Sequence, residues 1–319
     1  MNIRITGSGA VAEQPGGSGE APWFDPAEHL GRRGWKYLSP PTRYLLAAGH
    51  LALGRRHDDP PLTGDGSRRL GVVTGTQFAI AHVHRRMDDT LRTEGVRGIS
   101  PAEVPGFSMS TPGSQLAIAS GARAFSVTLT NPVTAGLEAV QFAVTALRTG
   151  RADRVVAAAT DQAPAGSERR GQHDAAAAVV LSAPDPASPS RAFAGITGGT
   201  SRFVPRNGDG APEPAALTGA ARRIAALTGD AREVRLVVSA PAGAARLAAA
   251  VRDAVAGAVA AAGGSVRDPE RAVTESRHCA VSGMLELIAL AGTGEPALLI
   301  SVSESGHLTA LALNGSARP

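Results

Sequence analysis

The sequence predicts an α/β protein, and three observations support this class. Short apolar runs typical of strands alternate along the chain with longer amphipathic segments typical of helices. Hydrophobic residues make up 43% of the 319 residues, enough to bury a sizeable core in one large domain or two fused halves. The order of predicted elements has a similar rhythm in both halves, which indicates an internal structural duplication, although no clean sequence repeat is visible.

The predicted strands are runs rich in Val, Ile, Leu and Ala that end at Gly, Pro or Asp. They cover residues 2–11, 68–80, 125–131, 153–161, 174–184, 192–203 and 233–241, and a closing hairpin is predicted over 296–315. The first of them, "NIRITGSGAV", is expected to run into a Gly-rich turn.

The predicted helices share apolar residues at helical spacing. They cover residues 41–54, 81–95, 134–150, 214–229, 245–264 and 282–292, and a short helical stretch followed by a helix is predicted within 99–122. The Pro- and Ser-rich stretch "APDPASPSRA" (183–192) is the clearest linker. We therefore predict a first half over residues 1–182 and a second half over residues 192–319.

Composition excludes several classes of function. The net charge is +4 and the arginines are scattered, without the basic, aromatic-rich block of a nucleic-acid site, although basic patches could dock an acidic protein. The single cysteine, Cys279, excludes an intramolecular disulfide and a Cys-based zinc site. No signal pattern and no uninterrupted apolar run of membrane-spanning length is visible. We expect a cytoplasmic protein without a membrane or nucleic-acid partner.

Two short motifs are read as structural. "ITGSGAVA" (5–12) matches G-x-G-x-x-A, but a dinucleotide site would need a helix to begin there, and a loop-like stretch follows instead. His82 and His84 fall at the start of a predicted helix, where their side chains diverge, so we interpret them as solvated helix residues. No cofactor and no metal are predicted.

A tight corner between a strand and a helix is more specific. Residues 99–162 resemble the nucleophile region of the β-ketoacyl-ACP synthases, in which a strand ends in T-A-C-x-x-G before a helix, and G-x-A-D precedes the next strand. The spacing fits without gaps. The matching residues are Ile99, Ser100, Pro101, Val104, Pro105, Gly121, Gly136, Leu137, Gly150, Ala152 and Asp153.

The resemblance implies the thiolase fold, in which two fused α/β halves form a five-layered α-β-α-β-α sandwich. Residues 5–11 and 71–76 are similar to two further strand segments of that family, and "DAAAAVVLSA" stands where the family has E-G-A-x-x-x-V-L. The fold is expected to be shortened here, because the long loop that follows residue 162 in the family is cut short.

The same resemblance implies that the nucleophile is lost. The corner holds Asn131, Pro132, Val133 and Thr134, and Val133 occupies the position of the acyl-accepting cysteine. A ketosynthase needs a thiolate at this helix N-terminus to form a thioester, and valine cannot supply one. Thr134 carries a hydroxyl, but the sequence shows no evident base to activate it.

The remaining catalytic groups of the family are also missing. Its first histidine position corresponds to the segment 240–242, which is Ala-Pro-Ala. Its second corresponds to Arg277 without a gap or to His278 with a shift of one residue, and this choice stays open. The family lysine is absent, since Lys36 is the only lysine of the chain, and the gate loop is replaced by "SESGHLT" (303–309).

This pattern resembles the chain-length factor, the silent subunit of type II polyketide synthases. The resemblance implies a heterodimer with a Cys-bearing ketosynthase, contact with an acyl carrier protein through the complex, and a role in setting polyketide or polyene chain length. Two alternatives stay open. One is a thiolase-fold acyltransferase or hydrolase that uses Thr134 or Cys279, and the other is a homodimeric acyl-binding protein.

The resemblance also implies positions for the interface and the acyl tunnel. The strand before the corner is expected to pair across the dimer through Ser126, Val127, Thr128, Leu129 and Thr130. The chain-length candidates are Gln77, Phe78, Phe107 and Met109.

Overall fold

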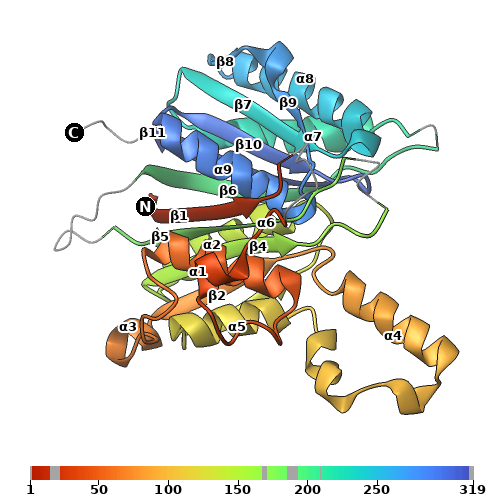
Figure 1. Cartoon of the computed structure of the whole chain (residues 1–319). Coiled ribbons are helices and arrows are strands. Elements are labelled where there is room, and N and C mark those ends of the chain that lie inside the picture. Colours follow the sequence, from red (N-terminus) through yellow and green to blue (C-terminus); the bar gives the residue numbers. More distant parts are fainter. Residues whose placement is uncertain (1, 15–21, 167–170, 185–192, 209, 316–319) are drawn as a thin grey trace.

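One mixed sheet runs through the whole molecule in the computed structural model, which describes residues 2–14, 22–166, 171–184, 193–208 and 210–315 (Figure 1). Its strands lie in the order β3-β2-β4-β5-β1-β6-β11-β10-β7-β8, and β9 also pairs with β7. The first part contains β1 (Ile3–Ala12), β2 (Leu70–Gly75), β3 (Phe125–Leu129), β4 (Arg154–Asp161) and β5 (Ala175–Ser182). The second contains β6 (Ala194–Phe203), β7 (Glu233–Ala240), β8 (Ser265–Arg267), β9 (Val273–Glu275), β10 (Ala297–Val302) and β11 (His307–Gly315).

The two parts of the sheet repeat one topology. If β6 is taken as the first strand of the second part, and β8 and β9 together as its third, both parts have the order third, second, fourth, fifth, first. They join where β1 pairs antiparallel with β6, with Ile5 opposite Ala194. The boundaries 1–182 and 192–319 stay a prediction, and most of the predicted linker, residues 185–192, lies outside the described residues.

The longer helices confirm the sequence-based expectations to within a few residues. They are α2 (Pro40–Leu53), α4 (Ala81–Thr93), α5 (Thr111–Ser120), α6 (Ala135–Arg148), α7 (Pro214–Ala225), α8 (Ala245–Ala261) and α9 (Ser282–Thr293). The short helices α1 (Pro26–Leu30) and α3 (Gly64–Arg68), like β8 and β9, were not predicted from the sequence. The 3₁₀ segment Pro101–Phe107 is the predicted short helical stretch before α5, and a further 3₁₀ segment, Val96–Gly98, was not predicted.

The helices and the sheet form five layers (Figure 1). α6 and α9 lie between the two parts of the sheet, where Leu137 and Met284 belong to one buried cluster with strands of both parts. α2 and α5 cover the outer face of the first part through residues such as Leu45. α7 and α8 cover the outer face of the second through Ile224 and Leu247. The predicted α-β-α-β-α sandwich is confirmed.

The two central helices approach closely because each has a glycine in its first turn. A Cβ atom at Gly136 of α6 would overlap the carbonyl oxygen of Ala280. A Cβ atom at Gly283 of α9 would lie 2.8 Å from Cγ of Leu137, closer than ordinary contact. Glycine therefore sets the distance between the two halves at their centre.

The predicted Gly-rich turn after the first strand is wrong. β1 continues through this motif to Ala12, and its residues from Gly7 to Ala12 pair with β5. Gly7 and Gly9 are instead needed because α2 lies directly on the strand, and a Cβ atom at either would overlap the backbone of Ala52 or Ala48. The motif thus serves helix–strand packing.

One segment projects from the body of the molecule. α4 and the two 3₁₀ segments after it, residues 81–107, extend away from the layers (Figure 1). Val83 is the one residue of α4 that is fully buried. We call residues 81–107 the arm.

The carboxylate of Asp161 ties the two halves together at the end of β4. It is fully buried, and its Oδ1 accepts hydrogen bonds from Thr76 Oγ1 (2.8 Å), Gln77 N (2.9 Å) and Phe78 N (2.6 Å). Its Oδ2 accepts a hydrogen bond from Ala280 N (3.0 Å), in the turn before α9. Burial raises the pKa of Asp161 to about 6, although each of these hydrogen bonds favours the charged form.

This raised pKa predicts how stability depends on pH. Between the ordinary aspartate pKa of 3.8 and about 6, the folded protein binds the Asp161 proton more tightly than the unfolded chain does. The group therefore stabilises the fold at low pH, and that contribution is lost as the pH rises through 6, at a cost of about 3 kcal/mol.

Asp161→Asn has no such titration. As the pH rises from 4 to 7, the free energy of unfolding of the wild type should fall relative to that of the variant. Urea denaturation at each pH measures both. Asp153→Asn is the matched control, because the ion pair with Arg69 lowers the pKa of the exposed Asp153 carboxyl and gives the opposite sign. A wild-type advantage over Asp161→Asn that grows with pH would contradict the assignment.

Candidate functional site

The corner between β3 and α6 has the shape of a nucleophile elbow but carries valine at its tip. Val133 has a φ of 64°, a left-handed conformation that is unfavourable for L-residues and more so for β-branched ones. Its side chain is 7% exposed. The tip lies two residues before the start of α6, where the helix dipole would favour a negative charge.

The backbone of the corner is held by local hydrogen bonds. The Val133 N–H donates to Oε1 of Gln77 at 3.2 Å. An N–H at such a tip is the group that would stabilise a developing oxyanion in acyl transfer. Here that donor is already bound to a side chain of the protein.

Thr134 has a carboxylate partner that sequence reasoning missed. Its hydroxyl donates to Oε1 of Glu138 at 2.9 Å, four residues further along the chain. Asn131 Nδ2 donates to both carboxylate oxygens of Glu138 (3.1 and 2.8 Å), and Thr309 Oγ1 lies 3.4 Å from Oε1. Glu138 is therefore a carboxylate within hydrogen-bond distance of the Thr134 hydroxyl that was not evident from the sequence, and the i, i+4 spacing was the available signal. Thr134 itself is fully buried.

The turn before α9 is the counterpart of this corner in the second half. Cys279 has a φ of 49° there and is 2% exposed. Burial, followed by the Asp161 carboxylate, raises the pKa of its thiol. A neutral, buried thiol is a poor nucleophile.

The structure places Arg277 and His278 in different surroundings. Arg277 is exposed, with its guanidinium 2.9 Å from the Glu275 carboxylate. His278 is half-buried, and its Nε2 lies 3.1 Å from the Glu13 carbonyl oxygen. Burial is the main cause that lowers the pKa of His278, so the ring is neutral at pH 7.

The two other positions expected to lack catalytic groups lie in short turns. β7 ends at Ala240, and a 3₁₀ turn at 242–244 follows without an ionisable side chain. Residues 303–306 form the tight connection between β10 and β11, where Ser303 N donates to His307 O at 2.9 Å. The predicted closing hairpin is confirmed.

The chain-length candidates divide into two groups. Gln77 lies at the corner, where its Oε1 accepts a hydrogen bond from the Val133 N–H. Phe78 is the next residue; it is half-buried, and its N–H donates to the Asp161 carboxylate. Phe107 lies on the arm, 48% exposed, with its ring 4.2 Å from that of His84. Met109, just beyond the arm, is half-buried.

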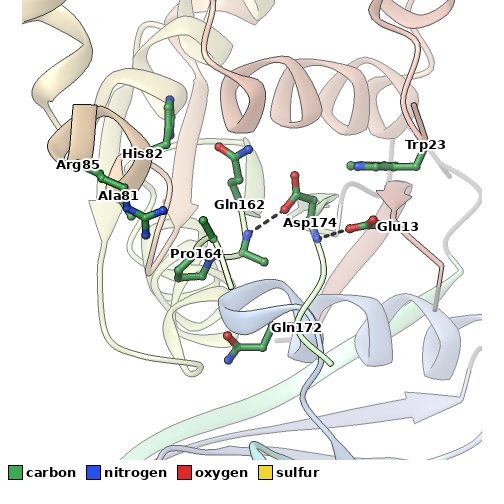
Figure 2. Close-up of a pocket in the computed structure, with 11 residues that line it drawn as sticks. Glu13, Trp23, Ala81, His82, Arg85, Gln162, Pro164, Gln172 and Asp174 are labelled. Carbon is green, nitrogen blue, oxygen red and sulfur yellow. Dashed lines mark hydrogen bonds between the residues drawn. The ribbon is translucent and has the colours of Figure 1, made fainter. Parts of the chain in front are cut away.

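A polar pocket of about 280 Å³ opens between the ends of β1 and β4 and the start of α4. Figure 2 shows His82 and Arg85 of α4 on one side and Glu13 and Trp23 on the other. His82 is half-buried and its pKa is lowered by burial, so its interpretation as solvated is wrong, whereas His84 is exposed. Sequence reasoning missed this pocket because its walls come from segments far apart in the chain.

The strand predicted to pair across a dimer forms one edge of the sheet. Within the described residues, β3 pairs with β2 alone, so its other side is open. Ser126 is exposed, while Val127, Thr128 and Leu129 are half-buried. Thr130 lies beyond the end of the strand.

Two further properties concern the described part of the chain. Its His, Cys, Asp and Glu residues form no group of three or more that could hold a metal ion. None of its helices combines the length and apolar character required to cross a bilayer.

Comparisons with solved structures show the fold. A chain of the AntDE:AntF complex, a type II polyketide synthase acyl-carrier protein with its ketosynthase bound to the hexaketide, has a TM-score of 0.77 at 16% identity, over 98% of this chain and 99% of that one. The ishigamide ketosynthase/chain length factor has a TM-score of 0.73 at 18% identity, over 99% of both chains. An oxazolomycin ketosynthase domain of Streptomyces albus JA3453 has a TM-score of 0.70 at 16% identity, over 99% of this chain and 96% of that one.

The sequence comparisons identify the family. No curated protein matches the chain. Residues 9–210 match the family model described as "Beta-ketoacyl synthase, N-terminal domain", which is more than half of the chain. With the thiolase-like ketosynthase fold of its structural neighbours, the protein belongs to the β-ketoacyl synthase family.

Proposed function

We propose that this chain is a catalytically silent chain-length factor, which pairs with a Cys-bearing ketosynthase and shapes the acyl tunnel in type II polyketide or polyene biosynthesis. The observation that carries the proposal is Val133 at the tip of an elbow with a φ of 64°. The geometry of a nucleophile site is retained, while the residue at its tip cannot form a thioester.

The surroundings of Val133 support a silent corner. The N–H that would stabilise an oxyanion is bound to Gln77, and the nearest thiol, Cys279, is buried and neutral. Condensation needs a thiolate and groups that stabilise an enolate together, and such cooperative sets lose most of their activity when one member is missing.

The relatives by structure support the choice of partner. One is described as a ketosynthase/chain length factor and another as a type II polyketide synthase ketosynthase in complex with its acyl-carrier protein. We propose the same kinds of partner for this chain: a Cys-bearing ketosynthase directly, and an acyl carrier protein through the complex. The proposed place of action is the cytoplasm.

The open edge of β3 supports a subunit interface. Thr76 N donates to Leu129 O at 3.0 Å, so the backbone polar groups of Leu129 face β2. Because these groups alternate in direction along a strand, those of Ser126 and Thr128 face the open edge. An unpaired row of donors and acceptors is suited to pairing with a strand of another chain.

Apolar side chains are exposed beside this edge and on the arm. Ile118, on α5 beside β3, is 66% exposed. The arm adds Leu91, Val96, Val104 and Phe107, which are 44, 77, 56 and 48% exposed. Large apolar side chains exposed to this extent suit a surface that a partner protein covers.

A second function is favoured by one observation. The hydroxyl of Thr134 donates to the Glu138 carboxylate, as a nucleophile and its base would, and this suits an acyltransferase or hydrolase. Against it, Thr134 has no exposed surface and Glu138 is held by two further donors. A homodimeric acyl-binding protein would use the same surface as the silent subunit but need no Cys-bearing partner.

Acylation distinguishes the silent subunit from the enzyme. When the co-expressed heterodimer is incubated with an acyl-acyl carrier protein, mass spectrometry should find the acyl group on the partner's cysteine and none on this chain. Val133→Cys should gain no condensation activity without the partner, because its N–H donor is occupied and the family's first histidine position, residues 240–242, is Ala-Pro-Ala. Acylation of Thr134 that disappears in both Thr134→Ala and Glu138→Gln would establish the enzyme instead.

Proline in β3 tests the interface. Thr128→Pro removes a donor that faces the open edge without disturbing the pairing with β2, so the chain should fold but bind its partner at least about tenfold more weakly. Thr128→Val keeps the N–H and should bind normally. Gel filtration and titration of the partner measure both, and an unchanged affinity of Thr128→Pro would reject β3 as the interface.

Truncation of Phe78 and Phe107 tests the chain-length role. Phe107→Ala should change the stability of the chain by less than about 1 kcal/mol, because the ring is half exposed, whereas a core Phe→Ala costs about 3–5 kcal/mol. If either ring closes the tunnel, its alanine variant should give longer products by mass spectrometry. Phe203→Ala, 54% exposed in the second half, is the matched control. Stable complexes of both variants with unchanged product length would exclude these residues from the tunnel end.

A further inference from the structure

Two pockets adjoin on the outer face of the first half, around the C-terminal end of α2. They have volumes of about 240 and 260 Å³, and both are lined by His50 and His57. α2 covers the face of the sheet opposite to α6, so these pockets are separated from the Val133 corner by the sheet itself. They therefore form a site independent of the proposed function.

The larger of the two is lined by cationic and histidine side chains. Arg55, Arg56, His29, His50 and His57 form its polar wall, together with one carboxylate, Glu28. We call this space the basic pocket. The segment 28–59 contains nine Lys, Arg or His residues and three carboxylates, those of Glu28, Asp58 and Asp59, and the Arg56 guanidinium lies 3.3 Å from the Asp58 carboxylate. Such a wall favours an anion.

Arg55 gives the strongest indication of an anion site in this wall. Its side chain is only 15% exposed, and the carboxylate paired with it, that of Asp59, is 4.0 Å away. One of its terminal nitrogens donates to the Pro60 carbonyl oxygen, while the other, Nη1, has no acceptor. His50 Nδ1 is likewise buried without a hydrogen-bond partner. A desolvated guanidinium with a free donor is stabilised by a carboxylate or phosphate group.

The smaller pocket has a mainly apolar wall. It is formed by Leu30, Trp35, Leu38, Leu46, Pro61 and Ala119, with Arg33 and Asp59 as further polar members beside the shared histidines. We call it the apolar pocket. The Trp35 ring is fixed, because its Nε1 donates to Gly31 O at 2.8 Å and the Arg43 guanidinium lies 4.9 Å from its ring centroid.

We propose that the basic and apolar pockets together bind a small amphipathic anion, an aromatic or aliphatic group that carries a carboxylate or a phosphate monoester. The anionic group lies in the basic pocket with Arg55 and Arg56. The apolar group lies against Trp35 in the apolar pocket. His50 and His57 stand at the boundary and can donate to the anion from either pocket.

Fluorescence of Trp35 can test this directly. The chain has two tryptophans, so Trp23→Phe leaves Trp35 as the single reporter. The probes are 4-phenylbutyrate, phenyl phosphate, the neutral 4-phenylbutanol and inorganic phosphate. We expect saturable changes with the first two, at least tenfold weaker binding of the alcohol, and weaker binding of inorganic phosphate than of phenyl phosphate. Whichever organic anion binds more tightly identifies the anionic group.

Charge-removing variants locate the site. Arg55→Gln and Arg56→Gln should each weaken binding of the tighter anion at least tenfold, and Arg56 serves if Arg55→Gln fails to fold, because its side chain is 79% exposed. Arg223→Gln on α7, exposed on the opposite outer face, should leave binding unchanged. Equal affinity for the alcohol and the anions, no saturable signal, or equal weakening by Arg223→Gln would overturn the proposal.

Discussion

The buried carboxylate of Asp161 is the interaction on which the centre of the molecule depends. It holds the segment after β2 through the N–H groups of Gln77 and Phe78, and the turn before α9 through that of Ala280. Gln77 in turn accepts the N–H of Val133, so the same carboxylate positions the corner at the third strand. Ala280 packs against Gly136, which lets α6 and α9 meet. Both halves are therefore aligned around one ionisable group whose burial is offset by four hydrogen bonds.

The strained corner persists although it has no nucleophile to present. An unfavourable φ at a β-branched residue costs about 1–3 kcal/mol and survives only where the surroundings determine it. Three features fix the conformation of the corner here: the hydrogen bond to Gln77, the close approach of α6 to α9 and the short connection to β3. The elbow is thus a property of the fold, and it persists without the residue that would make it a nucleophile.

The sequence predicts the layers well, because period and composition report local structure and burial. The strand 153–161 and the helix 134–150 are examples, recovered to within two residues. The prediction fails where a contact between distant parts of the chain determines the role of a residue. Gly7 and Gly9 look like a turn but serve the packing of α2, and the Glu138 partner of Thr134 is visible only as a helical spacing. The pocket beside α4 joins segments distant in the chain, so no local pattern reveals it.

Valine does more at the corner than omit a thiol. At 7% exposure its side chain fills the space at the tip, and Thr134 behind it has no accessible surface. A small polar residue would leave this helix N-terminus open to an acyl carbonyl, whereas a branched apolar one closes it. An acyl chain would then have to reach this subunit from another side, and the open β3 edge and the exposed apolar side chains of the arm are two such places. Closure of the corner and exposure of that surface together favour a subunit that receives a chain from its partner over one that binds a substrate alone.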